Sequence, residues 1–439
     1  MHKQGALREF GHYAAMNILG MIGISCYILA DTYFVAQGLG SLGLAALNIA
    51  IPAYNLMNGI GLMLGVGAAT QYTIARAQND RRQADSVFTH AAALGLLLGL
   101  LFLLGGLCFA KPLAGLLGAD AQTLGMTTTY LRMLWCFGPF FVMNNVLLAF
   151  TRNDGAPTVA MCGMIAGSLF NIVFDYIFIF PCGLGMFGAA LATGFSPFVS
   201  ILVLLTHLRR PSRGFHLVKT PLRVSRVPSL CAPGLSSLIG EIASGVVLLL
   251  FNLVLLRLSG NTGVAAYGVV KKIDQLPLNV SMGLCQGFMP LVGYNYASGN
   301  YKRMRKISVF SWKTAVVMSA CFVACFAVFA PEIMTLFIRE EQTSTLGASF
   351  LRIACLAVPL TSVNFLISYT LQAMGKGVQS AALTFSRQGL VNIPLLIILN
   401  FIFGLYGMIW TQLVTELIML PVSLGMYWST FRKIRSEAR

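Results

Sequence analysis

Asp31 and Asp175 lie within apolar segments of the first half of the chain. Moving a carboxylate from water into hydrocarbon is costly unless the group is neutralised, solvated or paired, so an acid in such a segment indicates a functional site. A buried carboxyl group can take up a proton or coordinate a hard cation such as Na⁺. The two aspartates are therefore the first candidates for ion-dependent chemistry.

The chain has fourteen acidic residues, most of them in predicted loops and tails. The acids at predicted membrane depth are Asp31, Asp175, Glu241, Asp274 and Glu416. Asp31 and Asp175 each stand about five or six residues from the outer end of an apolar segment. At ~1.5 Å per residue both lie roughly 8 to 9 Å below the same surface, so one cavity can hold the pair.

The composition is that of a membrane protein. Of 439 residues, 57% are hydrophobic and only 10% are charged, and the mean hydropathy is +0.77. Globular chains carry about a quarter charged residues. Apolar stretches of roughly 20 residues recur about twelve times. We predict an all-α integral membrane protein with twelve transmembrane helices.

Basic residues give the chain its net charge of +16, and they fall in alternate loops. The largest groups lie at 209–226, at 302–306 and at 432–439, and others precede the first span and follow the second. By the positive-inside rule, both termini and the central loop are cytoplasmic. This distribution argues against nucleic acid as a partner. The ten cysteines form no CxxC pair, which argues against a disulfide framework or a zinc site.

The two halves of the chain are related in sequence. A shift of 220 residues aligns Leu131, Arg132, Pro139, Asn144 and Gly155 with Leu351, Arg352, Pro359, Asn364 and Gly375. We predict an N-lobe at 1–208, a cytoplasmic linker at 209–230 and a C-lobe at 231–439, each lobe with six helices and the two pseudo-symmetric. Transporters built from such repeats bind substrate between the lobes and rock one against the other. The shift pairs Asp31 and Asp175 with Phe251 and Leu395, so only the first copy carries the acid pair.

Three polar residues are expected near the pair. Asn171 precedes Asp175 by one helical turn and shares its face. Thr193 lies at a comparable depth in the sixth span, and Asn145 lies deeper in the fourth. Their oxygens, together with the carboxylates, would suit either a proton or Na⁺.

Several segments resemble a known family. They are ADTYFVAQGLGSLGLAALNIAIP from residue 30, GLMLGVGAATQYTIARAQND from residue 61, GVAAYGVVKKID from residue 263 and QGFMPLVGYNYASGNYKR from residue 286. The whole chain resembles the multidrug and toxic compound extrusion (MATE) family, closest to its bacterial DinF-like and MepA-like branches. The resemblance implies the MATE fold and cation-driven export across the bacterial cytoplasmic (inner) membrane. It also implies a cation-linked network, and Asp31, Asp175, Asn171, Asn145 and Thr193 match its positions.

The resemblance extends to Glu241 and to helix 1. In the NorM-like branch a glutamate at the place of Glu241 belongs to a C-lobe cation site, which makes this residue a candidate for a second cation site or for binding substrate. The partner acid of that site has no counterpart here. Some DinF-like members bend helix 1 at a proline. This chain has none between Tyr13 and Gln37, so Gly20 and Gly23 are the candidate hinge.

Arg387 and Glu416 fall at similar depth on adjacent predicted helices, and we expect a structural ion pair between them. Asp274 follows Lys271 by three residues, which allows a second, local pair.

The function predicted from the sequence is secondary antiport: export of organic, cationic and amphiphilic compounds in exchange for H⁺ or Na⁺, by rocker-switch alternating access. Negative charge in an apolar cavity favours cationic substrates. We expect no cofactor, no metal beyond a possible Na⁺ at the aspartate pair, membrane lipid as surroundings, and a monomer. The alternative is a flippase for a lipid-linked or other amphiphilic substrate, which typically needs a positively charged cavity. An enzyme is disfavoured because the five histidines form no acid or metal motif and no Walker sequence is present.

Overall fold

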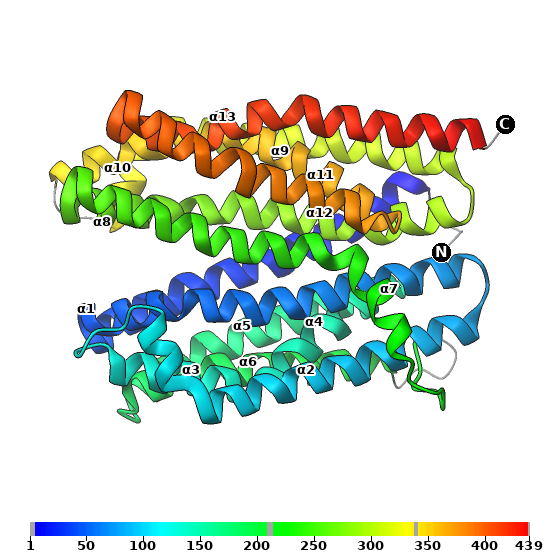
Figure 1. Ribbon diagram of the computed structural model, residues 1–439, viewed down its shortest axis with the longest axis horizontal. Helices are drawn as coiled ribbons and strands as arrows, with labels where there is room; N and C mark the ends of the chain where they lie inside the picture. The colour runs from blue at the N-terminus through cyan, green and yellow to red at the C-terminus, as the bar shows by residue number, and fades with distance from the viewer. Residues whose placement is uncertain (1–4, 209–213, 338–340, 438–439) are drawn as a thin grey trace.

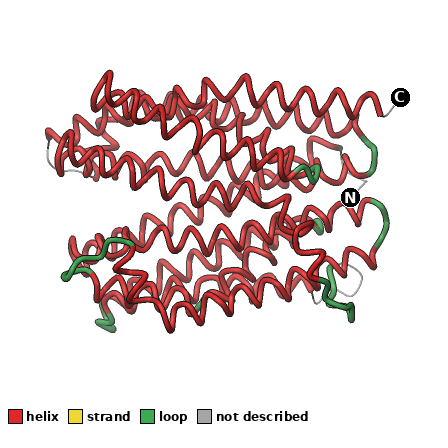
Figure 2. The backbone as a smooth tube through the Cα atoms, viewed as in Figure 1, coloured by secondary structure: helices red, strands yellow, loops and turns green. Residues whose placement is uncertain are grey.

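The structure is a computed structural model that describes residues 5–208, 214–337 and 341–437. These residues are helical apart from short connections, with no strand among them (Figure 2). The α-helices are α1 (Ala6–Ala77), α2 (Arg81–Leu116), α3 (Leu124–Cys136), α4 (Gly138–Asn153), α5 (Pro157–Ile179), α6 (Gly185–Leu208), α7 (Val227–Cys231), α8 (Leu235–Ala297), α9 (Tyr301–Phe337), α10 (Glu341–Ala354), α11 (Val358–Ala373), α12 (Gly377–Phe385) and α13 (Asn392–Glu437). The short elements are η1 (Val224–Arg226), η2 (Ala232–Gly234), η3 (Cys355–Ala357) and η4 (Ser386–Val391).

The protein is a multi-pass membrane protein. In the part of the chain that the structure describes, nine helices are long and apolar enough to cross a membrane. Counting α3 and α4 as one span bent by 51° brings the number to ten. Continuous helices also hide breaks: α1 is interrupted at Gly40 (φ 66°) and α13 at Gly404 (φ 58°), a left-handed conformation that glycine adopts without strain. The count of twelve spans and the cytoplasmic termini stay predictions.

The two halves of the chain form two layers of helices. Figure 1 shows α2 to α6 gathered on one side and α8 to α13 on the other, with both termini at the same end. The most extensive contact between two helices joins α1 to α8. This seam connects the first half of the chain to the second.

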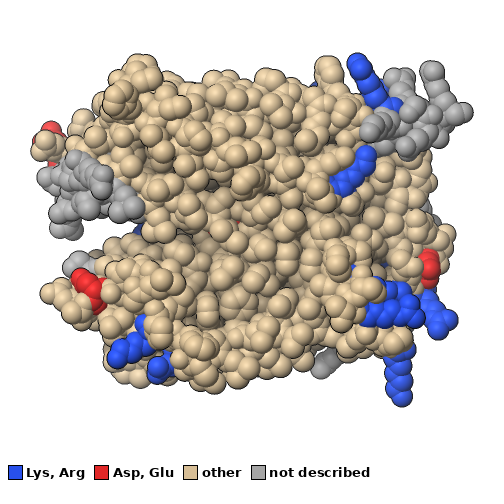
Figure 3. Space-filling view, viewed as in Figure 1, with Lys and Arg blue, Asp and Glu red and all other residues tan. Residues whose placement is uncertain are grey.

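The surface agrees with a membrane setting. Figure 3 shows Lys and Arg mainly at the ends of the molecule, with a broad band of uncharged side chains between them. In the same view the surface is hollowed between the two halves at the end opposite the termini. Exposed apolar residues such as Leu101, Phe401 and Val317 are expected where a side chain faces lipid rather than water.

Two glycines let α1 and α8 approach closely near the terminal end of the seam. A Cβ atom at Gly287 would lie 2.7 Å from the Tyr13 carbonyl oxygen, and one at Gly283 would lie 2.9 Å from the Ile18 Cα. Either distance is shorter than a normal contact, so the two backbones can meet only because these side chains are missing. The seam is therefore specified by residue size.

We expect Gly287→Ala to destabilise the protein by about 1–3 kcal/mol, because the added methyl group must push α1 away from α8. The matched control is Gly268→Ala on the same helix, where a Cβ would meet no atom within 4 Å. It should be neutral or stabilising by up to about 1 kcal/mol, since alanine favours the helix. Unfolding of the purified variants in detergent measures both, and equal stability would contradict the role of Gly287.

Candidate functional site

Asp31 and Asp175 are neighbours in the structure. Asp31 lies on α1 and Asp175 on α5, with exposed fractions of 8% and 0%, and their carboxyl groups are hydrogen-bonding partners. The Oδ1 atom of each is buried and has no hydrogen-bond partner among the described residues. Two carboxyl groups in direct contact and out of water require a proton or a cation between them. The structure thus brings the two aspartates together, and a shared cavity around them stays a prediction.

Gly20 of α1 lies close to α5. A Cβ at Gly20 would lie 2.8 Å from the Met164 Sδ, shorter than a normal contact, whereas one at Gly23 would make an ordinary contact of 3.5 Å with the Ile165 Cγ1. The missing side chain at Gly20 therefore leaves room for Met164 of α5. The break in the helical backbone of α1 falls at Gly40, well beyond these positions. A hinge at Gly20 and Gly23 stays a prediction.

Asn171 and Thr193 extend the pair toward α6. Asn171 is fully buried, and its Nδ2 lies 3.3 Å from the Thr193 Oγ1. In the amide orientation that satisfies both of its polar atoms, Asn171 donates to the Asp175 Oδ2 at 3.0 Å and accepts from the Thr193 N–H at 3.3 Å. Asn171 thus joins the carboxyl pair to α6, as its position one turn from Asp175 suggested.

Small residues fix the spacing of α5 and α6 around this contact. A Cβ at Gly167 would lie 2.9 Å from the Ser196 carbonyl oxygen, and the Ser196 hydroxyl donates to the Gly167 carbonyl oxygen at 2.8 Å. Because this contact lies one turn from Asn171, it holds that amide within reach of α6.

Asn145 lies with Glu241 rather than with the aspartates. Asn145 donates to the Asn58 Oδ1 at 3.1 Å, and Asn58 in turn hydrogen bonds to the Glu241 carboxyl group. Asn55 donates to the Glu241 carbonyl oxygen at 3.4 Å. The structure therefore has two separate clusters of polar residues, one around Asp31 and Asp175 and one around Glu241. The sequence prediction, which rested on membrane depth and on the family resemblance, had joined Asn145 to the first.

Tyrosines that were not predicted from the sequence lie between these two clusters of polar residues. Tyr27, one helical turn before Asp31, hydrogen bonds to Tyr54 in the second half of α1. Tyr130 on α3 hydrogen bonds to Thr193. The position of Tyr27 four residues before Asp31 was the one sequence signal that could have found it. The tyrosine hydroxyls give the region polar lining without charge.

Lys272 is another residue near the pair that was not predicted from the sequence. It lies on α8, and its ammonium group acts electrostatically on the Asp31 carboxyl group. The antiparallel register of the seam agrees, because Asn279 of α8 donates to the Ser25 Oγ of α1 at 2.8 Å, about two turns from each charged residue. Lys272 therefore brings a cation of the second half to the acid pair of the first.

Arg152 joins α1 to α8 at the other end of the seam, near the two chain termini. It is 6% exposed on α4, and its Nη1 donates to the Asn17 Oδ1 of α1 at 3.1 Å and to the Gln286 Oε1 of α8 at 2.5 Å. Nearby, Arg303 of α9 forms an ion pair with Glu9 of α1. Both contacts tie the first half of the chain to the second.

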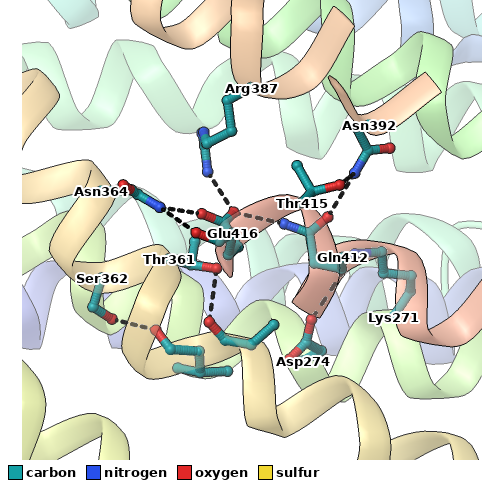
Figure 4. A network of polar contacts seen from close by, with 12 residues as sticks. Lys271, Asp274, Thr361, Ser362, Asn364, Arg387, Asn392, Gln412, Thr415 and Glu416 are labelled. Atoms are coloured by element: carbon teal, nitrogen blue, oxygen red, sulfur yellow. Dashed lines mark hydrogen bonds and ion pairs between the residues drawn. The ribbon is translucent and has the colours of Figure 1, made fainter. Parts of the chain in front are cut away.

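A separate buried network surrounds Glu416 on α13 (Figure 4). The Arg387 Nη1 lies 2.9 Å from the Glu416 Oε1, Gln412 donates to the same oxygen at 2.8 Å, and Asn364 donates to Oε2 at 2.6 Å. Arg387 lies in η4, a π-helical turn, with its guanidinium over the Phe365 ring. Glu416 is fully buried, and each of its carboxylate oxygens accepts at least one hydrogen bond. The predicted local pair is looser: the Lys271 Nζ lies 3.9 Å from the Asp274 Oδ2, compared with 2.9 Å between Arg387 and Glu416.

The duplication and the fold agree with a known family. The MatE family model matches the chain twice, over residues 17–177 and 237–398, and the two matches begin at the 220-residue offset of the sequence repeat. The chain belongs to the MatE family. The earlier resemblance to MATE proteins is thereby confirmed.

Named MatE proteins are similar over nearly the whole length. The multidrug export protein MepA of Staphylococcus saprophyticus is 28% identical over 418 residues, covering 95% of this chain and 92% of the relative. MepA of Staphylococcus aureus strain MRSA252 is 28% identical over 419 residues, covering 94% and 92%. A solved outward-facing conformation of a multidrug resistance MATE family transporter of the MOP superfamily superposes with a TM-score of 0.92 at 24% identity, covering 99% and 97%. The last comparison establishes the MATE fold.

We expect Glu416→Gln to destabilise the protein by about 3–5 kcal/mol, because it leaves the buried Arg387 guanidinium without its counter-charge. The control is Glu332→Gln, which removes an exposed carboxylate and should stay within about 0.5 kcal/mol of the parent protein. Denaturant unfolding in detergent measures both. If Glu416→Gln were as stable as Glu332→Gln, the ion pair would not be structural.

Proposed function

We propose that this protein is a proton-coupled antiporter that exports organic cations, with Asp31 and Asp175 as the coupling pair. The observation that carries the proposal is the direct contact between two buried carboxyl groups, which share a proton when no other cation stands between them. The export function is supported by the names of the MepA relatives and by membership of the MatE family.

The buried acids set the chemistry of exchange. When the pair releases its proton on the cytoplasmic side, it carries net negative charge in an apolar region, which attracts a cationic substrate from that side. When a proton then binds from the outside, that attraction falls and the substrate is released to the outside. Asn171 follows the change because it donates to Asp175 and contacts Thr193 of α6.

Glu241 is proposed as a contact for the cationic part of the substrate. It is half-buried, it belongs to the second half of the chain, and its carboxyl group is held by Asn58 of the first half. The Tyr27–Tyr54 pair lies between it and the aspartates. Lys272 supplies a built-in cation next to Asp31, which a substrate cation would have to displace or avoid.

Alternating access is proposed to work by rocking of the two halves. In this structure Arg152 and the Glu9–Arg303 pair join the halves at the end of the molecule that holds the termini, while the opposite end is hollowed (Figure 3). If the termini are cytoplasmic, this conformation faces outward. Inward opening would then have to break the Arg152 contacts and separate α1 from α8 near Gly287.

The test is dye uptake into proteoliposomes driven by an imposed pH gradient or, in separate vesicles, by an imposed Na⁺ gradient. We expect the pH gradient alone to drive uptake of a fluorescent organic cation. Asp31→Asn and Asp175→Asn should each reduce driven uptake to the level of empty vesicles, because an amide cannot exchange the proton.

The control is Asp274→Asn, which removes another buried carboxylate of the same residue type and should keep driven uptake. Normal uptake by both aspartate variants would refute the coupling pair. Uptake driven by Na⁺ alone would keep the pair but replace the proton with Na⁺. Failure to move any organic cation, together with transport of a lipid-linked amphiphile, would favour the flippase function.

A further inference from the structure

A basic groove lies on the outer face of α9, away from the aspartates and Glu241. This shallow, open groove has a volume of about 390 Å³ and is lined by the side chains of Lys302, Arg305, Lys306 and Lys313 together with apolar residues. All four basic residues are exposed. No acidic residue is part of the lining, so the groove is a concentrated positive surface.

The spacing of these residues places them on one face of the helix. Lys302, Lys306, Val309 and Lys313 follow one another at intervals of three or four residues, which is the repeat of one helical stripe. The opposite stripe, which includes Met304 and Ile307, is buried against the core. The basic side chains therefore point outward by the same periodicity that buries the core residues.

The basic side chains of the groove are not engaged in the ion pairs of the described residues. Arg303, the neighbour of Lys302, pairs with Glu9 on α1. Among the ion pairs recorded for residues 5–208, 214–337 and 341–437, none involves the four basic residues of the groove. An anion would find four partly solvated cations without a competing carboxylate.

Apolar surface adjoins the charges and continues along α9. Val309 and Phe310 line the groove and are 49% and 39% exposed, and Leu7 of α1 completes it. Farther along the same helix Val317 and Val328 are each 64% exposed. The groove thus opens at one end of a long apolar face that a bilayer would cover. A ligand that suits it has an anionic head and hydrocarbon tails.

We propose that the groove between the start of α9 and the first turn of α1 binds an anionic phospholipid, with the phosphodiester among Lys302, Arg305, Lys306 and Lys313. The acyl chains would lie over Val309 and Phe310 and continue along α9. Charge complementarity identifies the head, and the exposed apolar face identifies the tails. Because Leu7 and Glu9 belong to α1, a lipid bound here touches both halves of the chain at the end where the Glu9–Arg303 pair joins them.

Native mass spectrometry of the full-length protein in detergent tests the site, with phosphatidylglycerol and phosphatidylcholine as probes. The parent protein should retain phosphatidylglycerol in preference to phosphatidylcholine. Lys302→Gln combined with Lys306→Gln should weaken phosphatidylglycerol binding roughly 25-fold, at roughly 5-fold for each charge removed near an anionic headgroup.

The matched control is Arg81→Gln combined with Arg82→Gln, which removes two exposed basic residues from the start of α2 and should leave binding unchanged. Equal retention of the two lipids by the parent protein would overturn the proposal, as would undiminished binding in the Lys302 and Lys306 variant. Displacement of phosphatidylglycerol by inorganic phosphate at matched concentration would show a free-anion site and would also overturn it.

Discussion

The contact between Asp31 and Asp175 is the interaction on which the rest of the first half depends. Two carboxyl groups at membrane depth are tolerated only if they are neutralised by a proton, a cation or hydrogen-bond donors. Gly20 leaves room for Met164 of α5 against α1, and Gly167 lets α6 lie close to α5, where Asn171 and Thr193 reach the Asp175 side of the pair. The packing of three helices is thus arranged around one electrostatic requirement, and any change of charge at the pair must be felt by all three.

The second half meets the same requirement differently. Glu416 is also a buried acid, but Arg387, Gln412 and Asn364 occupy its oxygens completely. Glu416 thus has a permanent counter-charge, whereas each carboxyl group of the aspartate pair has one oxygen without a hydrogen-bond partner among the described residues. The two halves, related by duplication, therefore surround their buried acids differently, and this difference is why exchange is proposed for the aspartate pair alone.

The kind of contact between the halves changes along the seam of α1 and α8. At the terminal end the backbones touch at Gly283 and Gly287, and Arg152 bridges them with neutral partners. Replacing hydrogen bonds from a guanidinium to neutral amides by hydrogen bonds to water costs less free energy than breaking a buried ion pair. Farther along, Lys272 faces Asp31 across the same seam, so the proposed rocking of the halves and the charge of the proposed coupling pair would act on one interface.

Sequence alone determined the class of protein and the residues worth examining. Hydropathy requires helices in a membrane, because backbone groups in hydrocarbon must be satisfied within each segment, and the 220-residue repeat is carried by local residue identities. The cost of a buried charge likewise singled out Asp31, Asp175, Glu241 and Glu416 without any coordinates. Depth along a helix, however, does not fix the direction in which a side chain points or which helix it meets. Only the tertiary structure separated Asn145 from the aspartates and placed it beside Asn58 and Glu241, and only the packing of α1 on α8 brought Lys272 to Asp31, since those contacts join residues far apart in the chain.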